Sequence, residues 1–358
     1  KKRPTPMIWL TQNTFCRRLL SVPLIFLLTA LMVCAAPLWL PISWLAGRLF
    51  SKARSALRCL SFITTYLLCE SVGIVVSFLL WAANSIARGD RNTFLENNRK
   101  LQFWWAETLK KAAERLFRLR FTVDGLETLA GPGAIVLPRH TSIGDTIFPV
   151  SFYAKSKGLG VRYVLKRELL LDPCLDIVGN RLPNVFLDRV ADNMSSELSA
   201  IRRLAQDAGD TDSLVIYMEG TRFSQKKRAR IVDLLRQRAD AALLDYAERW
   251  HNILPPRLAG AMALMEGAPD KDLLFCAHTG FEGAGSFATL FNGGWMDTDV
   301  RIRFWRVPAT EIPVDLESRK DFLLTQWDRM HREVAELNRQ SQRDRVSSVE
   351  GSAELAKR

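Results

Sequence analysis

The chain has 358 residues, of which 48% are hydrophobic and 25% are charged, and its formal net charge is +12. This length allows one large domain with an attached element, or two modest domains. The positive charge suits a nucleic acid, an anionic membrane or a phosphorylated substrate, and charge alone does not choose among them. The six cysteines form no CxxC pair and no metal-ligand spacing, so we expect neither disulfides nor a zinc site.

Two long apolar runs lie near the N-terminus. Residues 19–47 carry no charged side chain, and residues 59–87 carry only Glu70. Each run is long enough to cross a bilayer, and an ionised Glu70 in mid-membrane would cost only about 2 to 3 kcal/mol. Two buried helices of a soluble core are the alternative, which uncharged stretches of this length disfavour. The sequence therefore predicts a membrane-embedded element over residues 1–90.

Basic side chains flank both runs. Arg17 and Arg18 precede the first run, residues 48–58 between the runs contain four cations, and Arg88 and Arg91 follow the second. A helical hairpin that dips into one leaflet would let every flank face the same anionic lipids, on the cytoplasmic side of a bacterial inner membrane or its equivalent. Two full crossings are the alternative. Three prolines can bend the first run: Pro23, Pro37 and Pro41.

Residues 91–120 are predicted to form an amphipathic helix. Leu101, Trp105, Leu109 and Leu116 recur at helical spacing, with lysine and arginine over much of the remainder. A helix of this kind lies in a membrane interface or packs on its own domain, and the pattern suits both.

From residue 121 the pattern is that of an α/β domain, expected over residues 121–315. Strands are predicted at 121–129, 134–138, 161–166, 184–188, 213–219, 272–282 and 299–307, and helices at 195–209, 229–250 and 316–338. Strands separated by helices imply a mixed, mainly parallel sheet that is covered by helices. The segment 316–358 is expected to be a helix followed by a frayed polar tail.

The stretch RHTSIGDT places His140 five positions before Asp145, directly after the predicted strand at 134–138. In open α/β sheets the ligand site lies beyond the carboxyl ends of the strands. A carboxylate that binds one ring nitrogen fixes the imidazole tautomer and leaves the other nitrogen as a general base. A structural histidine that caps a helix is the alternative reading of this motif taken alone. The other histidines show no metal-ligand spacing and are expected to be structural: His251, His278 and His331.

A second motif, EGTR, comprises Glu219, Gly220, Thr221 and Arg222 at the end of the predicted strand 213–219. Glycine lets the backbone approach a ligand, the adjoining amides can point at an anion, and a guanidinium matches phosphate oxygens. Glu219 would orient Arg222 or receive a substrate hydroxyl. An ordinary surface turn with a solvated arginine is the alternative.

Together the two motifs resemble those of the glycerolipid acyltransferases, the family that includes the 1-acylglycerol-3-phosphate (lysophosphatidic acid) acyltransferases, whose signatures are NHxSxxD and FPEGTR. His140, Ser142 and Asp145 occupy the first signature, in which Arg139 replaces the usual asparagine. In the second, Tyr-Met replaces Phe-Pro and the last four residues are intact.

Two further landmarks follow in the family's order, so that the resemblance covers about residues 121–315. The segment KRELLLDPCLDIVGNRLPNVFLDR is similar to a basic segment that ends in an acid–arginine pair after a glycine. Its matching residues are Lys166, Gly179, Asp188 and Arg189. The stretch NILPPRLAG, with Pro256 and Arg257, is similar to the family's strand that ends in proline.

The resemblance implies transfer of a fatty acyl group from acyl-CoA or acyl-ACP to the free hydroxyl of a lysophospholipid, by default 1-acyl-glycerol-3-phosphate, which gives phosphatidic acid. His140 is then the general base and Asp145 holds its ring. The substrate-binding residues implied or suggested by the motifs are Ser142, Lys166, Arg189, Glu219, Gly220, Thr221, Arg222 and Arg257. No cofactor, no metal and no nucleic-acid partner is expected.

Three alternatives stay open. The same chemistry can act on another lysolipid, such as lysophosphatidylethanolamine, lysocardiolipin or an aminolipid. The chain can also be a lipid-binding protein without turnover, or a hydrolase that depends on Ser142; the chain lacks a GxSxG elbow, which disfavours a serine nucleophile. The basic run Lys226–Arg228 would face acidic lipid or the phosphates of the donor, or is only a solvated surface.

Overall fold

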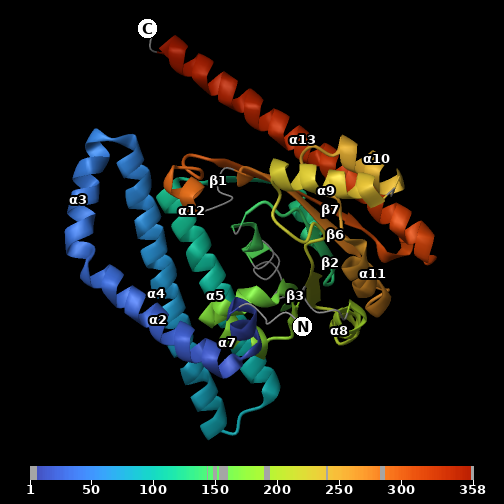
Figure 1. Ribbon diagram of the computed structural model, residues 1–358, viewed down its shortest axis with the longest axis horizontal. Helices are drawn as coiled ribbons and strands as arrows, with labels where there is room; N and C mark the ends of the chain where they lie inside the picture. The colour runs from blue at the N-terminus through green and yellow to red at the C-terminus, as the bar shows by residue number, and fades with distance from the viewer. Residues whose placement is uncertain are drawn as a thin grey trace.

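The centre of the fold is one sheet with the strand order β1-β7-β6-β2-β5-β3-β4 (Figure 1). The structure is a computed structural model that describes residues 6–142, 144–147, 151–152, 160–188, 194–238, 241–282 and 287–355. Its strands are β1 (Arg120–Asp124), β2 (Ile135–Pro138), β3 (Gly160–Lys166), β4 (Val185–Leu187), β5 (Asp212–Val215), β6 (Leu273–Thr279) and β7 (Asp299–Val307). Neighbouring strands are parallel except β6 and β7, which are antiparallel. The predicted mixed, mainly parallel sheet is confirmed.

Strand β2 lies in the middle of the sheet and is buried on both faces. Its Ile135 and Leu137 belong to one hydrophobic core and Val136 to the other, because alternate side chains of a strand point to opposite faces. A short apolar run without polar alternation is typical of such a strand. Since β5 and β6 both run parallel to β2, the three carboxyl ends meet at one edge of the sheet.

Helices cover both faces of the sheet, which gives three layers (Figure 1). One core is closed by α8 (Met194–Gln206), α11 (Leu258–Gly267) and α13 (Leu316–Leu355). The other core is closed by α4 (Ser51–Ile86), α5 (Arg91–Phe117) and α12 (Phe287–Phe291). Helix α5 buries Leu101, Leu109 and Phe117, so the face that its apolar spacing predicted packs inside the molecule.

Several elements differ from the predictions. Strand β5 ends at Val215, short of 219, and the chain closes a turn in which the Gly220 N–H donates to the Tyr217 carbonyl at 2.9 Å. No strand forms at NILPPRLAG: residues 251–257 are a loop, consistent with two prolines that lack N–H donors, and α11 begins at Leu258. The single helix predicted at 229–250 is two helices, α9 (Gln225–Arg238) and α10 (Ala241–Arg249). Helix α13 continues to Leu355, where a frayed tail was expected.

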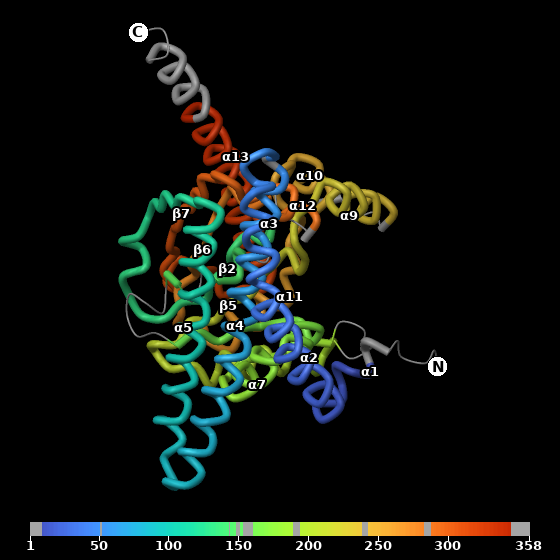
Figure 2. Tube along the Cα trace, turned by 90° about the vertical axis from the view of Figure 1, so that its left-hand side faces the viewer, coloured from blue at the N-terminus to red at the C-terminus, as the bar shows by residue number. Residues whose placement is uncertain are grey.

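The N-terminal runs fold as α1 (Pro6–Gln12), α2 (Thr14–Cys34), α3 (Ala36–Leu49) and α4. The helix axis breaks at Ala35, just before Pro37, and both α2 and α3 pack along α4 (Figure 2). By length and composition, Thr14–Cys34 and Lys52–Ile86 could each cross a membrane. Only 6% of the apolar window of the first is buried inside the protein, against 39% for the second.

Two charged side chains of this region face protein, which differs from the expectation that they meet the membrane. Glu70 is fully buried and accepts hydrogen bonds from the Trp105 indole at 2.8 Å and from the Cys174 N–H at 3.1 Å. Arg17 is buried in an ion pair of 2.7 Å with Asp176 of α7 (Pro173–Arg181). These contacts attach the apolar helices to the α/β domain.

Candidate active site

The two sequence motifs lie side by side because of the strand order. His140 follows β2, the Gly220–Arg222 turn follows β5, and His278 lies near the carboxyl end of β6. Since β2 pairs with β5 on one side and with β6 on the other, these three segments converge at the centre of one sheet edge.

His140 and Asp145 are bonded directly. The chain turns between them, and a short 3-10 helix, Gly144–Thr146, brings the Asp145 Oδ1 to 2.9 Å from the His140 Nδ1. The other oxygen, Oδ2, accepts the N–H groups of Thr141 at 2.5 Å and Ser142 at 2.8 Å. Burial acts to raise the pKa of the Asp145 carboxyl, but the nearby His140 and His278 and these N–H groups outweigh burial, so its pKa is below the usual value.

This arrangement leaves the His140 Nε2 as a proton acceptor. An ionised Asp145 can only accept a hydrogen bond, so Nδ1 carries the ring proton and donates it to Asp145, and the lone pair lies on Nε2. Nε2 has no hydrogen bond to any residue that the structure describes, and 14% of the His140 side chain is exposed. The Tyr217 ring lies 4.6 Å from the imidazole, and its hydroxyl donates to the Asp145 carbonyl at 3.1 Å, which supports both members of the pair.

The buried position of Glu219 differs from the expectation that this residue contacts substrate. Its Oε2 accepts the His140 N–H at 2.7 Å and its Oε1 accepts the Leu254 N–H at 2.8 Å, while only 2% of the residue is exposed. Burial raises the pKa of Glu219 to about 7, although Arg139 and the two N–H groups oppose the rise. The geometry makes Glu219 a bridge between the His140 backbone and the loop before α11.

The EGTR turn is bound to the segment that carries His140. Gly220 has φ of +68°, a left-handed conformation that glycine adopts without a Cβ clash, and the Phe223 N–H donates to the His140 carbonyl at 2.7 Å. The Lys227 ammonium donates to the Thr221 hydroxyl at 3.0 Å and to the Arg222 carbonyl at 2.9 Å. Burial and the neighbouring Arg222 lower the pKa of Lys227. Two cations thus lie beside a turn that adjoins His140.

The other predicted residues lie at different depths. Ser142 is fully buried, its Oγ accepting the Gly144 N–H at 3.4 Å, so this hydroxyl is part of the loop and is not placed as a substrate contact or nucleophile. Arg257 is exposed, and its N–H donates to the Met218 carbonyl at 2.7 Å, which places it beside the EGTR turn. Lys166 ends β3, which β5 separates from β2. Arg189 lies outside the described residues.

Sequence reasoning assigned no role in the site to two fully or almost fully buried residues beside the pair. Arg139, noted only as a departure from the motif, is 1% exposed and donates to the carbonyls of Asn252 and His278, both at 2.6 Å. His278 is fully buried, and its Nε2 lies 2.9 Å from the Arg139 carbonyl and 3.6 Å from the Asp145 Oδ2. The position of His278 within the predicted strand 272–282 was the one available signal.

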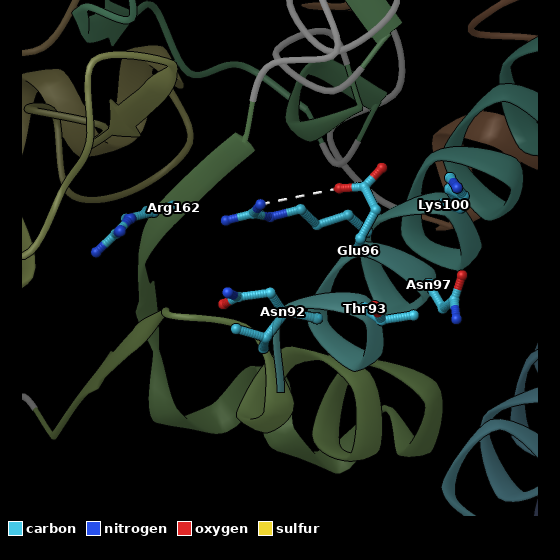
Figure 3. A pocket seen from close by; sticks show the side chains of 8 residues that line it. Asn92, Thr93, Glu96, Asn97, Lys100 and Arg162 are labelled. Carbon is cyan, nitrogen blue, oxygen red and sulfur yellow. Dashed lines mark ion pairs between the residues drawn. The ribbon is translucent and has the colours of Figure 1, made fainter. Parts of the chain in front are cut away.

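A surface pocket of about 620 Å³ lies away from these groups, at the amino ends of the strands. It is lined by Arg162 near the start of β3 and by one face of α5 that includes Asn92, Glu96, Arg99 and Lys100 (Figure 3). Within this face the Arg99 guanidinium lies 3.9 Å from the Glu96 carboxylate. None of the motif residues lines it. The described part of the chain holds no group of three or more histidine, cysteine or acidic side chains that would bind a metal ion.

Comparison with known proteins agrees with the geometry. Residues 120–253 match the family model named Acyltransferase, whereas none of the curated proteins matches the chain. Among solved structures, the 1-acyl-sn-glycerophosphate (LPA) acyltransferase PlsC from Thermotoga maritima is similar, with 17% sequence identity and a TM-score of 0.52. The similarity covers 80% of this chain and 99% of that one. Residues 120–253 are therefore an acyltransferase domain, carried on a chain with the fold of a lysophosphatidic acid acyltransferase.

Proposed function

We propose that this acyltransferase is membrane-bound and transfers a fatty acyl group from acyl-CoA or acyl-ACP to the free hydroxyl of a lysophospholipid, with 1-acyl-glycerol-3-phosphate as the acceptor. The observation that carries the proposal is the His140–Asp145 pair, bonded at 2.9 Å beside the EGTR turn within an acyltransferase domain.

The chemistry follows from the orientation of the imidazole. Nε2 of His140 takes the proton of the acceptor hydroxyl while the oxygen attacks the thioester carbonyl. Collapse of the tetrahedral intermediate then breaks the carbon–sulfur bond. The protonated His140 gives its proton to the leaving thiolate, which departs as the free thiol. Asp145 keeps the ring in the required tautomer and stabilises the imidazolium between the two steps.

The acceptor's phosphate would bind at the EGTR turn. Arg222 offers a forked guanidinium and Lys227 a second cation beside it, and both belong to the segment whose Phe223 N–H bonds to His140. Arg257 is a third cation near the turn. A phosphate held there would place the neighbouring hydroxyl of a lysolipid near the imidazole.

Exposed apolar side chains support attachment to a membrane. Large hydrophobic residues that are more than half exposed gather on α2 and α3: Phe15, Leu19, Leu20, Leu24, Leu27, Leu31, Leu38, Ile42, Trp44, Leu45 and Leu49. A patch of this kind is unusual on a soluble monomer and typical of a surface that meets lipid. Because α4 packs on the α/β domain through Glu70, we favour a hairpin embedded in one leaflet over two independent crossings. The basic side chains that flank both apolar runs favour the cytoplasmic side for the active site.

The test is a product assay with purified protein in mixed micelles. A labelled acyl-CoA, and separately acyl-ACP, is offered with lysophosphatidic acid, lysophosphatidylethanolamine, lysocardiolipin or an aminolipid. The proposal expects acceptor-dependent product, largest with lysophosphatidic acid, and unchanged chemistry in Ser142→Ala. Free fatty acid formed without acceptor, and lost in Ser142→Ala, would establish a hydrolase instead. Lipid binding without any turnover would establish a non-catalytic protein.

A further inference from the structure

The side chain of Arg139 is buried beside the segment that carries His140 and Asp145, here called the catalytic loop. It follows the central strand β2 and immediately precedes His140 in the chain, yet only 1% of the residue is exposed. A buried guanidinium is costly unless its N–H groups find acceptors, so its partners indicate what it does.

The guanidinium connects two segments that are distant in the sequence. Its Nε and Nη2 donate to the Asn252 carbonyl at 3.1 and 2.6 Å, and its Nη1 donates to the His278 carbonyl at 2.6 Å. Nη1 also forms an ion pair with the Glu282 carboxylate. The guanidinium carbon Cζ of Arg139 lies 5.4 Å from the ring centroid of Phe223, which follows the EGTR turn.

The first of these segments, the loop of residues 250–254, also holds the backbone of His140. The Leu254 N–H binds the Glu219 carboxylate, whose second oxygen accepts the His140 N–H. Helix α13 fixes the same loop from the other side, because the Trp327 indole donates to the Leu254 carbonyl at 2.9 Å. Arg139 and Glu219 therefore bind adjoining parts of one loop that is anchored on a buried tryptophan.

The second segment, the end of β6, lies beside the Asp145 carboxylate. His278 donates its Nε2 proton to the Arg139 carbonyl at 2.9 Å, while Arg139 donates to the His278 carbonyl, so the two residues bind each other reciprocally. The same Nε2 lies 3.6 Å from the Asp145 Oδ2. Burial lowers the pKa of His278 and so favours its neutral form, which makes it a dipolar neighbour of Asp145 and not a competing cation.

We propose that Arg139 is a positioning residue. It connects the loop of residues 250–254 and the end of β6 to the catalytic loop, and thereby fixes the orientation of the His140–Asp145 pair. The inference rests on the proposed function for its kinetic readout. Arg139 occupies the position of the first motif at which the resembled family has asparagine.

Arg162 provides a matched control. It is also a buried arginine, 8% exposed, with an ion pair to Asp212 at 2.5 Å and donors to the carbonyls of Leu204 and Asp207. It lies near the start of β3 and lines the pocket at the amino ends of the strands (Figure 3), whereas His140 follows the carboxyl end of β2. Loss of either guanidinium should weaken the fold, but only loss of Arg139 should disturb the site.

The experiment compares Arg139→Gln, Arg139→Lys and Arg162→Gln in the full chain. We expect Arg139→Gln to lower kcat roughly 10- to 100-fold, with each KM within about threefold of wild type, since a small misplacement of a reacting group has effects of this size. Arg162→Gln should lower the melting temperature and leave kcat within about threefold.

The pH profile adds a readout that a purely structural role would not move. Glu219 faces Arg139, His140 and Lys227, and Arg139 is the cation that most favours its ionised form. The ionised Glu219 carboxylate accepts the His140 N–H, so protonation of Glu219 should lower kcat at acid pH. Without Arg139 the pKa of Glu219 rises further, and the acid limb of the kcat profile should shift upward by roughly one pH unit in Arg139→Gln. Arg139→Lys keeps the charge and should keep the limb, with an intermediate kcat.

A measurement without substrate separates this inference from the proposed function. In protein labelled with ¹⁵N in histidine rings, the Nδ1 proton of His140 should give an exchange-protected NMR signal in wild type and in Arg162→Gln and lose it in Arg139→Gln. A wild type that acylates no lysolipid refutes the proposed function, while the NMR signal still decides the role of Arg139. If Arg139→Gln keeps that signal, or matches Arg162→Gln in kcat and pH limb, the inference is wrong.

Discussion

Glutamine in place of Glu219 should change how stability depends on pH. Burial raises the pKa of this carboxyl from its ordinary value of 4.5 to about 7, even though it accepts two N–H groups and faces Arg139. The folded chain therefore binds the proton more tightly than the unfolded chain does. The contribution of Glu219 to stability is greatest below pH 4.5 and is lost as the pH rises through about 7.

The size of the effect follows from the shift. A rise from 4.5 to about 7 corresponds to roughly 3 kcal/mol that the wild type loses across this range and that a neutral glutamine does not lose. For 358 residues, an unfolding entropy of about 2 cal/mol/K per residue converts this into a change of about 4 °C in melting temperature. The melting temperature of the variant relative to that of wild type should therefore rise by about 4 °C between pH 4.5 and pH 8.

The assay is thermal unfolding of wild type and Glu219→Gln in the same detergent, in steps from pH 4.5 to 8. Glu317→Gln, on the exposed surface of α13, controls for the loss of one negative charge. The variant should also be a poorer enzyme and carry a destabilisation that does not depend on pH, because glutamine offers one acceptor where two N–H groups need one each. A difference in melting temperature that stays constant over this pH range would refute a buried carboxylate at Glu219.

Three further substitutions test separate parts of the site. Asp145→Asn should lower kcat roughly 100- to 10,000-fold in steady-state assays, because the amide no longer holds the tautomer of His140; a loss below about threefold would contradict this role. Gly220→Ala should cost about 1 to 2 kcal/mol in denaturant unfolding, since alanine is strained at φ of +68°, whereas Gly209→Ala, whose Cβ would meet the Asp212 side chain at an ordinary contact distance of 3.9 Å, should not. Lys227→Met should raise the KM for lysophosphatidic acid roughly 10-fold and leave that for a monoacylglycerol unchanged, if the phosphate lies at the EGTR turn.

Much of the fold was readable from the sequence. The short apolar run at residues 134–138 and the pattern of residues 299–307 both predicted strands, and the helices between the predicted strands indicated a mainly parallel sheet. The proximity of RHTSIGDT and EGTR follows from both motifs ending strands of such a sheet. Where the prediction failed, as at residues 251–257, an apolar stretch with two prolines resembled a strand but cannot donate to a neighbouring strand there.

The support of the site was not readable. Arg139 binds backbone carbonyls more than one hundred positions away, and a carbonyl oxygen leaves no trace in residue type. The same holds for Glu219, since a carboxylate that accepts two backbone N–H groups looks, in a sequence, like one that faces substrate. Glu70 was misplaced for a related reason: hydropathy shows that a helix is apolar but not which of its faces meets protein.

The central claim is that the His140 imidazole accepts the proton of the lipid hydroxyl. The most direct measurement is the initial rate of labelled phosphatidic acid formation from acyl-CoA and lysophosphatidic acid by His140→Ala, beside His251→Ala, which replaces an exposed histidine outside the described pair. The account predicts a loss of roughly 100- to 10,000-fold for the first variant and less than about threefold for the second, with both proteins folded. A His140→Ala enzyme that keeps the wild-type rate would contradict it.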